Sequence, residues 1–188
     1  MAKRTNILAI GAVCLILGLT LCAGSCKSQA AAVNTSIAVP NIPPSYYACI
    51  QANIDDLLKQ YFFRYGNFYQ AEQAYDGQIF LFRGVQVNPA MIVDKNTFTL
   101  STAEFIALQP GAVGQLKVGE IIDIVGVDQG PMPTIEGTPI TAFFNPDGSP
   151  ALEGGVVPGW LQFSGCVFLP TGSVQLPAPG APAFAPLY

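Results

Sequence analysis

Few side chains in this sequence could do chemistry, because none of its 188 residues is a histidine. The lack of imidazole removes the commonest general base, proton shuttle and transition-metal ligand. Twelve acidic residues remain, but a glycosidase needs two carboxyl groups held about 5 to 9.5 Å apart across a cleft. No pair of acids in the sequence is singled out for that role. We therefore expect no enzymatic activity, no cofactor and no metal site.

The first 26 residues have the layout of a secretory signal. Lys3 and Arg4 form a basic start, and an uncharged apolar run extends from residue 7 to residue 21. The sequence Ala23-Gly24-Ser25-Cys26 resembles a bacterial lipobox, in which the signal is cut before a cysteine that becomes lipid-modified. An uncleaved membrane anchor is the alternative, since residues 7 to 25 approach the roughly 20 apolar residues that span a bilayer. Both interpretations place the remaining chain outside the cytoplasm, attached to a membrane; we favour a cell-envelope lipoprotein with Cys26 as its lipidation site.

Cys49 and Cys166 are the two cysteines outside this N-terminal segment. In an extracytoplasmic domain they could form a disulfide between the first turn of a helix and the last strand. Such a bond would stabilise the fold by roughly 4 to 5 kcal/mol in chain-entropy terms. Two unpaired buried thiols fit the sequence equally well, because pairing depends on geometry.

Composition limits the partners. Charged residues make up 11% of the chain, hydrophobic residues make up 51%, and the formal net charge is -4. An acidic chain with few cations is a poor binder of phosphate groups, so we expect no nucleic acid partner. A neutral surface rich in Gly and Pro suits a protein or glycan partner better.

Hydrophobic periodicity divides the chain after this signal. Residues 27–45 are small, polar and proline-bearing, as in a linker. Residues 46–75 carry apolar side chains at three- and four-residue steps, which predicts an amphipathic helix capped by Ser45. Gly66-Asn67 could divide that segment into two shorter helices. Residues 171–188 form a Pro/Ala-rich tail whose Phe184 and Tyr188 could fold back onto the domain.

Glycine-interrupted apolar runs predict five strands between residues 76 and 170. We expect a bulge at Gly84, a covering turn at 102–109, and a long loop at 129–159 with a hairpin turn at 145–148. The predicted strands span residues 78–87, 91–93, 97–100, 116–128 and 160–169. Five strands with a long excursion before the last one fit a Greek-key barrel of the oligonucleotide/oligosaccharide-binding (OB) type.

Residues 54–169, excluding the long loop, resemble the bacterial tRNA-anticodon-binding-like OB family. The resemblance rests on Ala74-Tyr75-Asp76-Gly77-Gln78, on Phe82-Arg83-Gly84-Val85, on the run from Leu116 to Val127, and on Phe163-Ser164-Gly165-Cys166. It implies a mainly β fold in an envelope protein, often a lipoprotein. A fold-level likeness carries no activity, so it does not imply tRNA binding.

The candidate binding surface is the long loop and the barrel groove beside it, because OB folds commonly vary their loops to reach ligands. It comprises Phe143 and Phe144 in the loop, Trp160 at the loop exit, and Arg83 on the first strand. A plug for the barrel end is the alternative role of Trp160. The sequence thus predicts a membrane-tethered, non-catalytic binding or assembly module. A single-stranded nucleic-acid-binding protein is the alternative, and Phe80, Phe82, Phe98 and Phe168 could supply its stacking rings.

Overall fold

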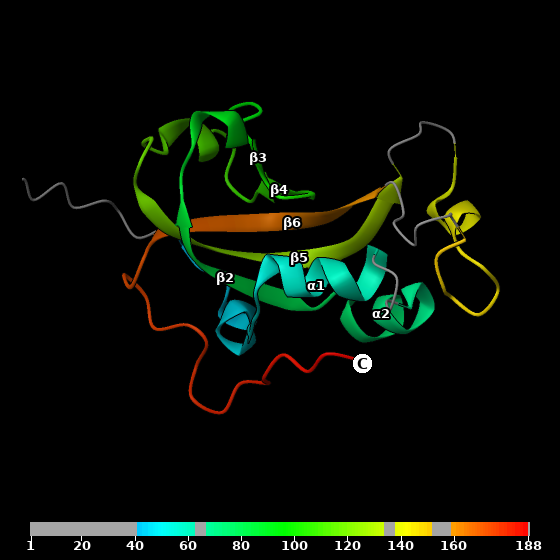
Figure 1. Ribbon diagram of the computed structural model, residues 1–188. Helices are drawn as coiled ribbons and strands as arrows, with labels where there is room; N and C mark the ends of the chain where they lie inside the picture. Colours follow the sequence, from blue (N-terminus) through cyan, green and yellow to red (C-terminus); the bar gives the residue numbers. More distant parts are fainter. Residues whose placement is uncertain (1–40, 63–66, 134–137, 152–158, 188) are drawn as a thin grey trace, which may run out of the picture. The chain divides into compact units, whose positions relative to one another are not determined.

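The computed structural model divides the chain into two compact units, residues 1–37 and 38–188. The structure describes residues 41–62, 67–133, 138–151 and 159–187, all of which belong to the second unit (Figure 1). The predicted signal or anchor at 1–26 lies outside the described residues, as does the linker up to residue 40. Among the described residues, no helix has the length and apolar character needed to cross a membrane.

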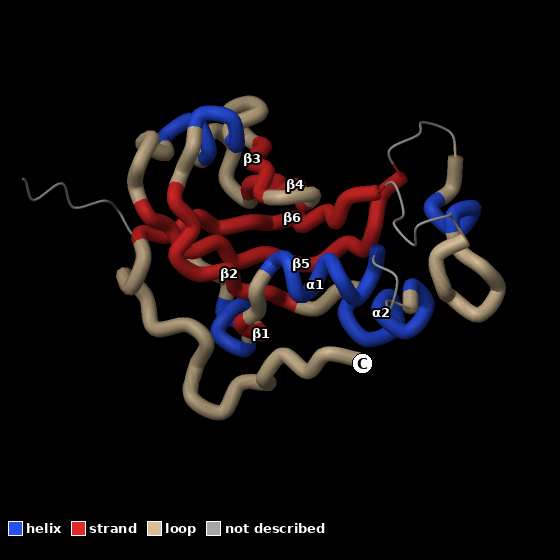
Figure 2. Tube along the Cα trace, in the orientation of Figure 1, coloured by secondary structure: helices blue, strands red, loops and turns tan. Residues whose placement is uncertain are grey.

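The second unit is mainly β and is built on one mixed sheet of six strands, ordered β1-β2-β5-β6-β4-β3 (Figure 2). The sheet does not close on itself, and β1 and β3 form its edges. Two of its pairings are parallel, β1 with β2 and β4 with β6, and the other three are antiparallel. The strands are β1 (Ile50–Gln51), β2 (Ile79–Gln86), β3 (Thr97–Leu100), β4 (Ala103–Ala107), β5 (Ile121–Pro133) and β6 (Gly159–Pro170).

Two of these strands were not predicted. The segment 102–109, expected to be a covering turn, contains β4, because Ala103 and Phe105 are buried at alternate positions and pair with Leu161 and Phe163 of β6. The short β1 lies in the segment expected to be helical. The predicted strand at 91–93 is reduced to one bridge between Ile92 and Phe98. This bridge lies beside a short 3-10 helix, η2 (Pro89–Met91).

The predicted bulge in β2 is confirmed. The register of β2 against β5 shifts between Phe82 and Val85, and Gly84 between them has a φ of 67°. Such left-handed backbone strains any residue with a Cβ, so glycine is needed at this position.

The hairpin of β5 and β6 is longer than predicted and shortens the expected loop 129–159 at both ends. Pairing continues to Pro133 opposite Gly159. The connection contains η4 (Ile140–Phe143) and a tight turn in which the Gly148 N–H donates to the Asn145 carbonyl at 2.9 Å. An antiparallel bridge between Phe144 and Pro150 closes that turn, which confirms the hairpin predicted around Asn145.

The region predicted as helix holds four short elements. They are η1 (Pro44–Ala48), β1, α1 (Ile54–Phe62) and α2 (Phe68–Tyr75). Ser45 lies inside η1, so it caps no α-helix; α1 begins after Asn53, whose side chain accepts from the Asp55 N–H at 2.8 Å. Asn67 caps α2 by accepting from the Gln70 N–H at 3.1 Å, which confirms the alternative of two helices.

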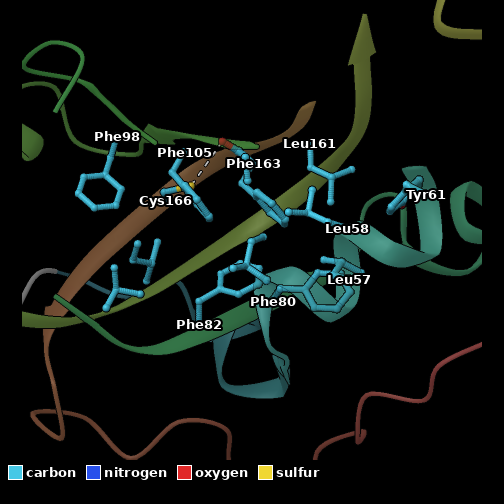
Figure 3. Close-up of a cluster of buried hydrophobic side chains, with 14 of the residues drawn as sticks. Leu57, Leu58, Tyr61, Phe80, Phe82, Phe98, Phe105, Leu161, Phe163 and Cys166 are labelled. Carbon is cyan, nitrogen blue, oxygen red and sulfur yellow. Dashed lines mark hydrogen bonds between the residues drawn. The ribbon is translucent and has the colours of Figure 1, made fainter. Parts of the chain in front are cut away.

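The sheet buries a hydrophobic cluster on each face, because successive side chains of a strand point to opposite sides. The larger cluster, dominated by phenylalanine rings, lies under α1 and α2; Figure 3 shows Phe80, Phe82, Phe105 and Phe163 converging in it. The Phe105 and Phe163 rings stack with centroids 4.9 Å apart. The smaller cluster on the other face comprises Ile42, Tyr46, Cys49, Leu81, Val125, Val167, Leu169 and Leu176.

Cys49 and Cys166 are both buried free thiols. Cys49 belongs to the smaller cluster and Cys166 to the larger one, so the sheet separates them. The structure therefore has the second of the two predicted arrangements. Burial raises the pKa of both thiols, which favours the protonated, unreactive form.

Candidate functional site: an open groove at the end of β2

An open groove of about 620 Å³ lies where β2 ends. Its lining comes from the end of β2 and the turn after it, from the end of β3, and from the loop before β5. The lining residues are Gly84, Val85, Gln86, Val87, Asn88, Pro89, Met91, Leu100, Val118 and Gly119. The groove thus brings together segments that are far apart in the sequence.

Backbone hydrogen bonds fix the two walls of the groove to each other. The Val87 N–H donates to the Glu120 carbonyl at 2.9 Å, and the Gly119 N–H donates to the Val87 carbonyl at 2.8 Å. The Glu120 side chain accepts from the Lys117 N–H at 2.7 Å, which holds the loop before β5 in a tight turn. On the opposite side, the Thr99 hydroxyl donates to the Met91 carbonyl at 3.3 Å and ties β3 to η2.

The groove is apolar and uncharged. Val85 and Val87 are buried in its wall, and the amide side chains of Gln86 and Asn88 are exposed. No lining residue carries a charge, a nucleophile or a titratable acid. Val118 in the lining is 63% exposed, and Ile121, which pairs with Gln86, is 54% exposed. Such a surface can bind a neutral ligand by apolar contact and amide hydrogen bonds, but it offers no group for acid–base or nucleophilic catalysis.

Comparisons of the chain with protein-family models, curated proteins and solved structures find no match. The function must therefore be argued from the described residues themselves.

The residues predicted as the binding surface do not form one site. Phe144 is buried, and its ring stacks on Phe68 of α2 with centroids 4.5 Å apart. Phe143 is a half-buried residue that packs against the larger cluster. Trp160 is half-buried near the start of β6, opposite Met132. These three aromatic residues lie at one end of the β5–β6 hairpin, whereas Arg83 lies on β2.

Arg83 is occupied by structural contacts on β2. Its guanidinium forms an ion pair with Asp123 at 3.1 Å, donates to the Gln51 side chain at 3.0 Å, and donates to the Leu176 carbonyl. Asp123 is buried and also accepts from the Gly84 N–H and the Thr171 hydroxyl, at 3.0 and 2.9 Å. Arg83 therefore joins β1, β2, β5 and the C-terminal tail, and it lines no part of the groove.

Among the acidic residues that the structure describes, Asp128 on β5 is fully buried and has the most perturbed surroundings. The loss of water raises its pKa to about 7, although hydrogen bonds from the Gly130 N–H (2.9 Å) and the Tyr61 hydroxyl (3.0 Å) oppose this shift. Burial, together with the nearby Asp128, also raises the pKa of Tyr61. Tyr61 belongs to α1, both residues are buried, and neither lines the groove. The hydrogen bond between the two side chains joins α1 to β5.

The described residues also contain no cluster of three or more acidic or cysteine side chains able to hold a metal ion. The four phenylalanines considered as stacking rings for nucleic acid, Phe80, Phe82, Phe98 and Phe168, are at most 8% exposed and pack in the larger cluster. Sequence reasoning missed the groove entirely. The sequence offered one signal, the apolar residues Val118 and Ile121 close to a strand end. Their exposure beside the groove is known only once β2 is seen to pair with β5.

Proposed function

We propose that the protein is a non-catalytic binding or assembly module, tethered to the outer side of a membrane, whose groove at the end of β2 takes a neutral partner, protein or glycan. One observation carries the proposal: the groove has an apolar lining with two exposed amides and no charged side chain. Sites of this kind bind by burial of apolar surface, with a few polar groups fixing orientation. The tether is proposed from the leader sequence alone.

An OB-type barrel is proposed as the frame of this site. Support comes from the strand order β2-β5-β6-β4-β3, in which β4 runs parallel to β6 and the other neighbours are antiparallel. Residues at the end of β2 and the end of β3 line the same groove. Bringing those two strand ends together would close the sheet into a partly open barrel, which is the OB arrangement.

The test is affinity capture of the tagged full chain from its native membrane, with mass spectrometry of the captured proteins and glycans and of the N-terminus. Val118→Asp places a charge in the groove, and Leu108→Asp places the same charge on another exposed apolar residue outside it. We expect a stoichiometric partner with the wild type and with Leu108→Asp, and its loss with Val118→Asp. Retention of that partner by Val118→Asp would refute the groove as the binding site.

The same preparation tests the tether and the nucleic acid alternative. A diacylglyceryl-modified Cys26 at the new N-terminus supports the lipoprotein, whereas an unmodified and uncleaved N-terminus contradicts it. Oligonucleotide affinity that falls steeply with salt would favour the alternative of a single-stranded nucleic-acid-binding protein.

A further inference from the structure

The outer edge of β2, which faces away from β5, is covered along its first part only. β1 pairs with β2 at Phe80 and Leu81, and the Ala52 N–H donates to the Leu81 carbonyl at 3.1 Å. β1 is covered in turn by the C-terminal tail, since Ala183 forms a parallel bridge with Gln51. Among the described residues, no strand pairs with the outer edge of β2 beyond Leu81.

Hydrogen bonds fix the direction of the backbone groups at the uncovered end of β2. Val87 forms its two backbone hydrogen bonds, of 2.9 and 2.8 Å, with the loop before β5. Because successive residues of a strand direct their backbone groups to opposite edges, Gln86 directs its N–H and its carbonyl away from β5. Ile121, opposite Gln86, agrees with this pattern, because its carbonyl accepts from the Thr171 N–H at 3.2 Å on the β6 side.

The outward groups of Gln86 lie in the lining of the groove. Val85 and Val87 flank Gln86 on β2, and Met91 and Leu100 line the groove from η2 and the end of β3. The groove therefore presents the donor and the acceptor of a strand edge beside aliphatic side chains. An extended polypeptide carries the matching acceptor and donor at the spacing of a strand, whereas a glycan has no such backbone.

We propose that the partner in the groove is an extended polypeptide segment with neutral side chains, which pairs with β2 at Gln86 as an added strand. The inference rests on the proposed function and deepens it, because it selects a polypeptide over a glycan for the same groove. An uncovered strand edge invites pairing with another chain. Main-chain hydrogen bonds supply the affinity of such a complex, and the aliphatic lining at Met91 and Leu100 selects an apolar side chain. The uncharged lining disfavours a charged side chain at that position, because no described lining residue could pair with it.

The test begins with a phage-displayed library of short random peptides, selected on the immobilised full chain in detergent. Gln86→Pro removes the outward N–H, and proline is compatible with an edge strand whose N–H faces solvent. Gln86→Ala is the matched control, because it removes the exposed amide side chain but keeps the backbone N–H. We expect neutral peptides with an aliphatic residue to be enriched on the wild type and on Gln86→Ala, but not on Gln86→Pro. Circular dichroism and cooperative urea unfolding confirm the fold of each variant.

Backbone methylation of the enriched peptide tests the pairing on the wild type, so the result does not depend on whether Gln86→Pro folds. Two fluorescent twins carry N-methyl groups on one or the other set of alternate residues, which blocks one edge of the peptide in each twin. The twin with the blocked pairing edge should bind at least about ten times more weakly in fluorescence anisotropy, since it loses backbone hydrogen bonds to β2. Gln86→Ala should change the affinity of the unmethylated peptide by no more than about threefold.

The outcomes separate this inference from the proposed function. Peptide binding that is lost with Val118→Asp but kept by a folded Gln86→Pro, or that is equal for the two methylated twins, would leave the groove as the site and overturn the strand pairing. Absence of any enriched peptide on the folded wild type would overturn it as well. Peptide binding that survives Val118→Asp would contradict the groove itself, and the proposed function with it.

Discussion

Asp128→Asn is expected to stabilise the protein at neutral and alkaline pH, although it removes a charged group that accepts two hydrogen bonds. The reason lies in the hydroxyl of Tyr61, which has one hydrogen and two acceptors. The Asp128 carboxylate lies 3.0 Å from it, and the Ala71 carbonyl lies 3.3 Å from it. When Asp128 is ionised, that hydrogen can serve only one of the two well.

Protonation of Asp128 satisfies both acceptors. The carboxylic acid then donates to the Tyr61 oxygen, Tyr61 donates to the Ala71 carbonyl, and the other carboxyl oxygen still accepts from the Gly130 N–H. The amide introduced by Asp128→Asn would reproduce this pattern with its NH₂ group toward Tyr61. Nearby acids also disfavour a negative charge on this pair. Asp76 raises the pKa of both Asp128 and Tyr61, and Glu72 raises the pKa of Tyr61.

The magnitude follows from linkage between protonation and folding. The pKa of Asp128 rises from 3.8 to about 7 on folding, a difference of about three units at roughly 1.4 kcal/mol each, which sets a limit of about 4 kcal/mol. Because the folded pKa is the higher one, the stabilising contribution is complete below pH 3.8 and is lost as the pH rises to about 7. The variant should therefore match the wild type near pH 4 and exceed it by up to about 4 kcal/mol near pH 8.

The assay is urea unfolding of both proteins at closely spaced pH values between 4 and 8.5. The difference between the two curves isolates Asp128 from the other acids. Asp147→Asn provides a control of opposite sign, because hydrogen bonds from Ser149 lower the pKa of that exposed carboxyl. Removing Asp147 should lower stability across the whole range of the assay, because the folded pKa of its carboxyl lies below 3.8. A wild type that gains stability over Asp128→Asn as the pH rises from 4 to 7 would refute the reasoning.

Three further substitutions test the packing of the sheet. Gly126→Ala should destabilise the protein by about 1 to 3 kcal/mol in urea unfolding, because the added Cβ would lie 2.5 Å from the Cys166 sulfur in the closed core. The loss should be smaller when Gly126→Ala is introduced into the Cys166→Ala variant, and an equal loss there would contradict this cause. Gly84→Ala meets no neighbour within 4 Å, so any loss, expected to be about 1 kcal/mol, reports the backbone φ of 67°, and an unchanged melting temperature would count against it. Arg83→Met leaves the buried Asp123 without its ion-pair partner and should cost about 3 kcal/mol or more, with part of the loss recovered in the double variant with Asp123→Asn.

Local sequence signals predicted the elements that rest on a local cause. The glycine at position 84 predicted the bulge, the Asn145 turn predicted a hairpin, and Gly66-Asn67 indicated the division into two helices, the second of which Asn67 caps. By contrast, β4 was missed because its alternation covers only five residues, and its strand character comes from parallel pairing with β6 more than 50 residues later. The burial of Phe144, one of the aromatic candidates for a binding surface, has a related cause, since its stacking partner Phe68 lies in α2.

The groove could not be predicted because it arises at the end of β2, where segments distant in sequence meet. The start of the outer edge of β2 is covered by β1 at Phe80 and Leu81, and β1 is in turn covered by the tail at Ala183. Past the bulge at Gly84, β1 no longer follows, and the strand end opens into the groove. An unpaired edge is a liability that proteins usually cover. In this protein the C-terminal tail covers the outer edge of β1, and the uncharged groove flanks the end of β2.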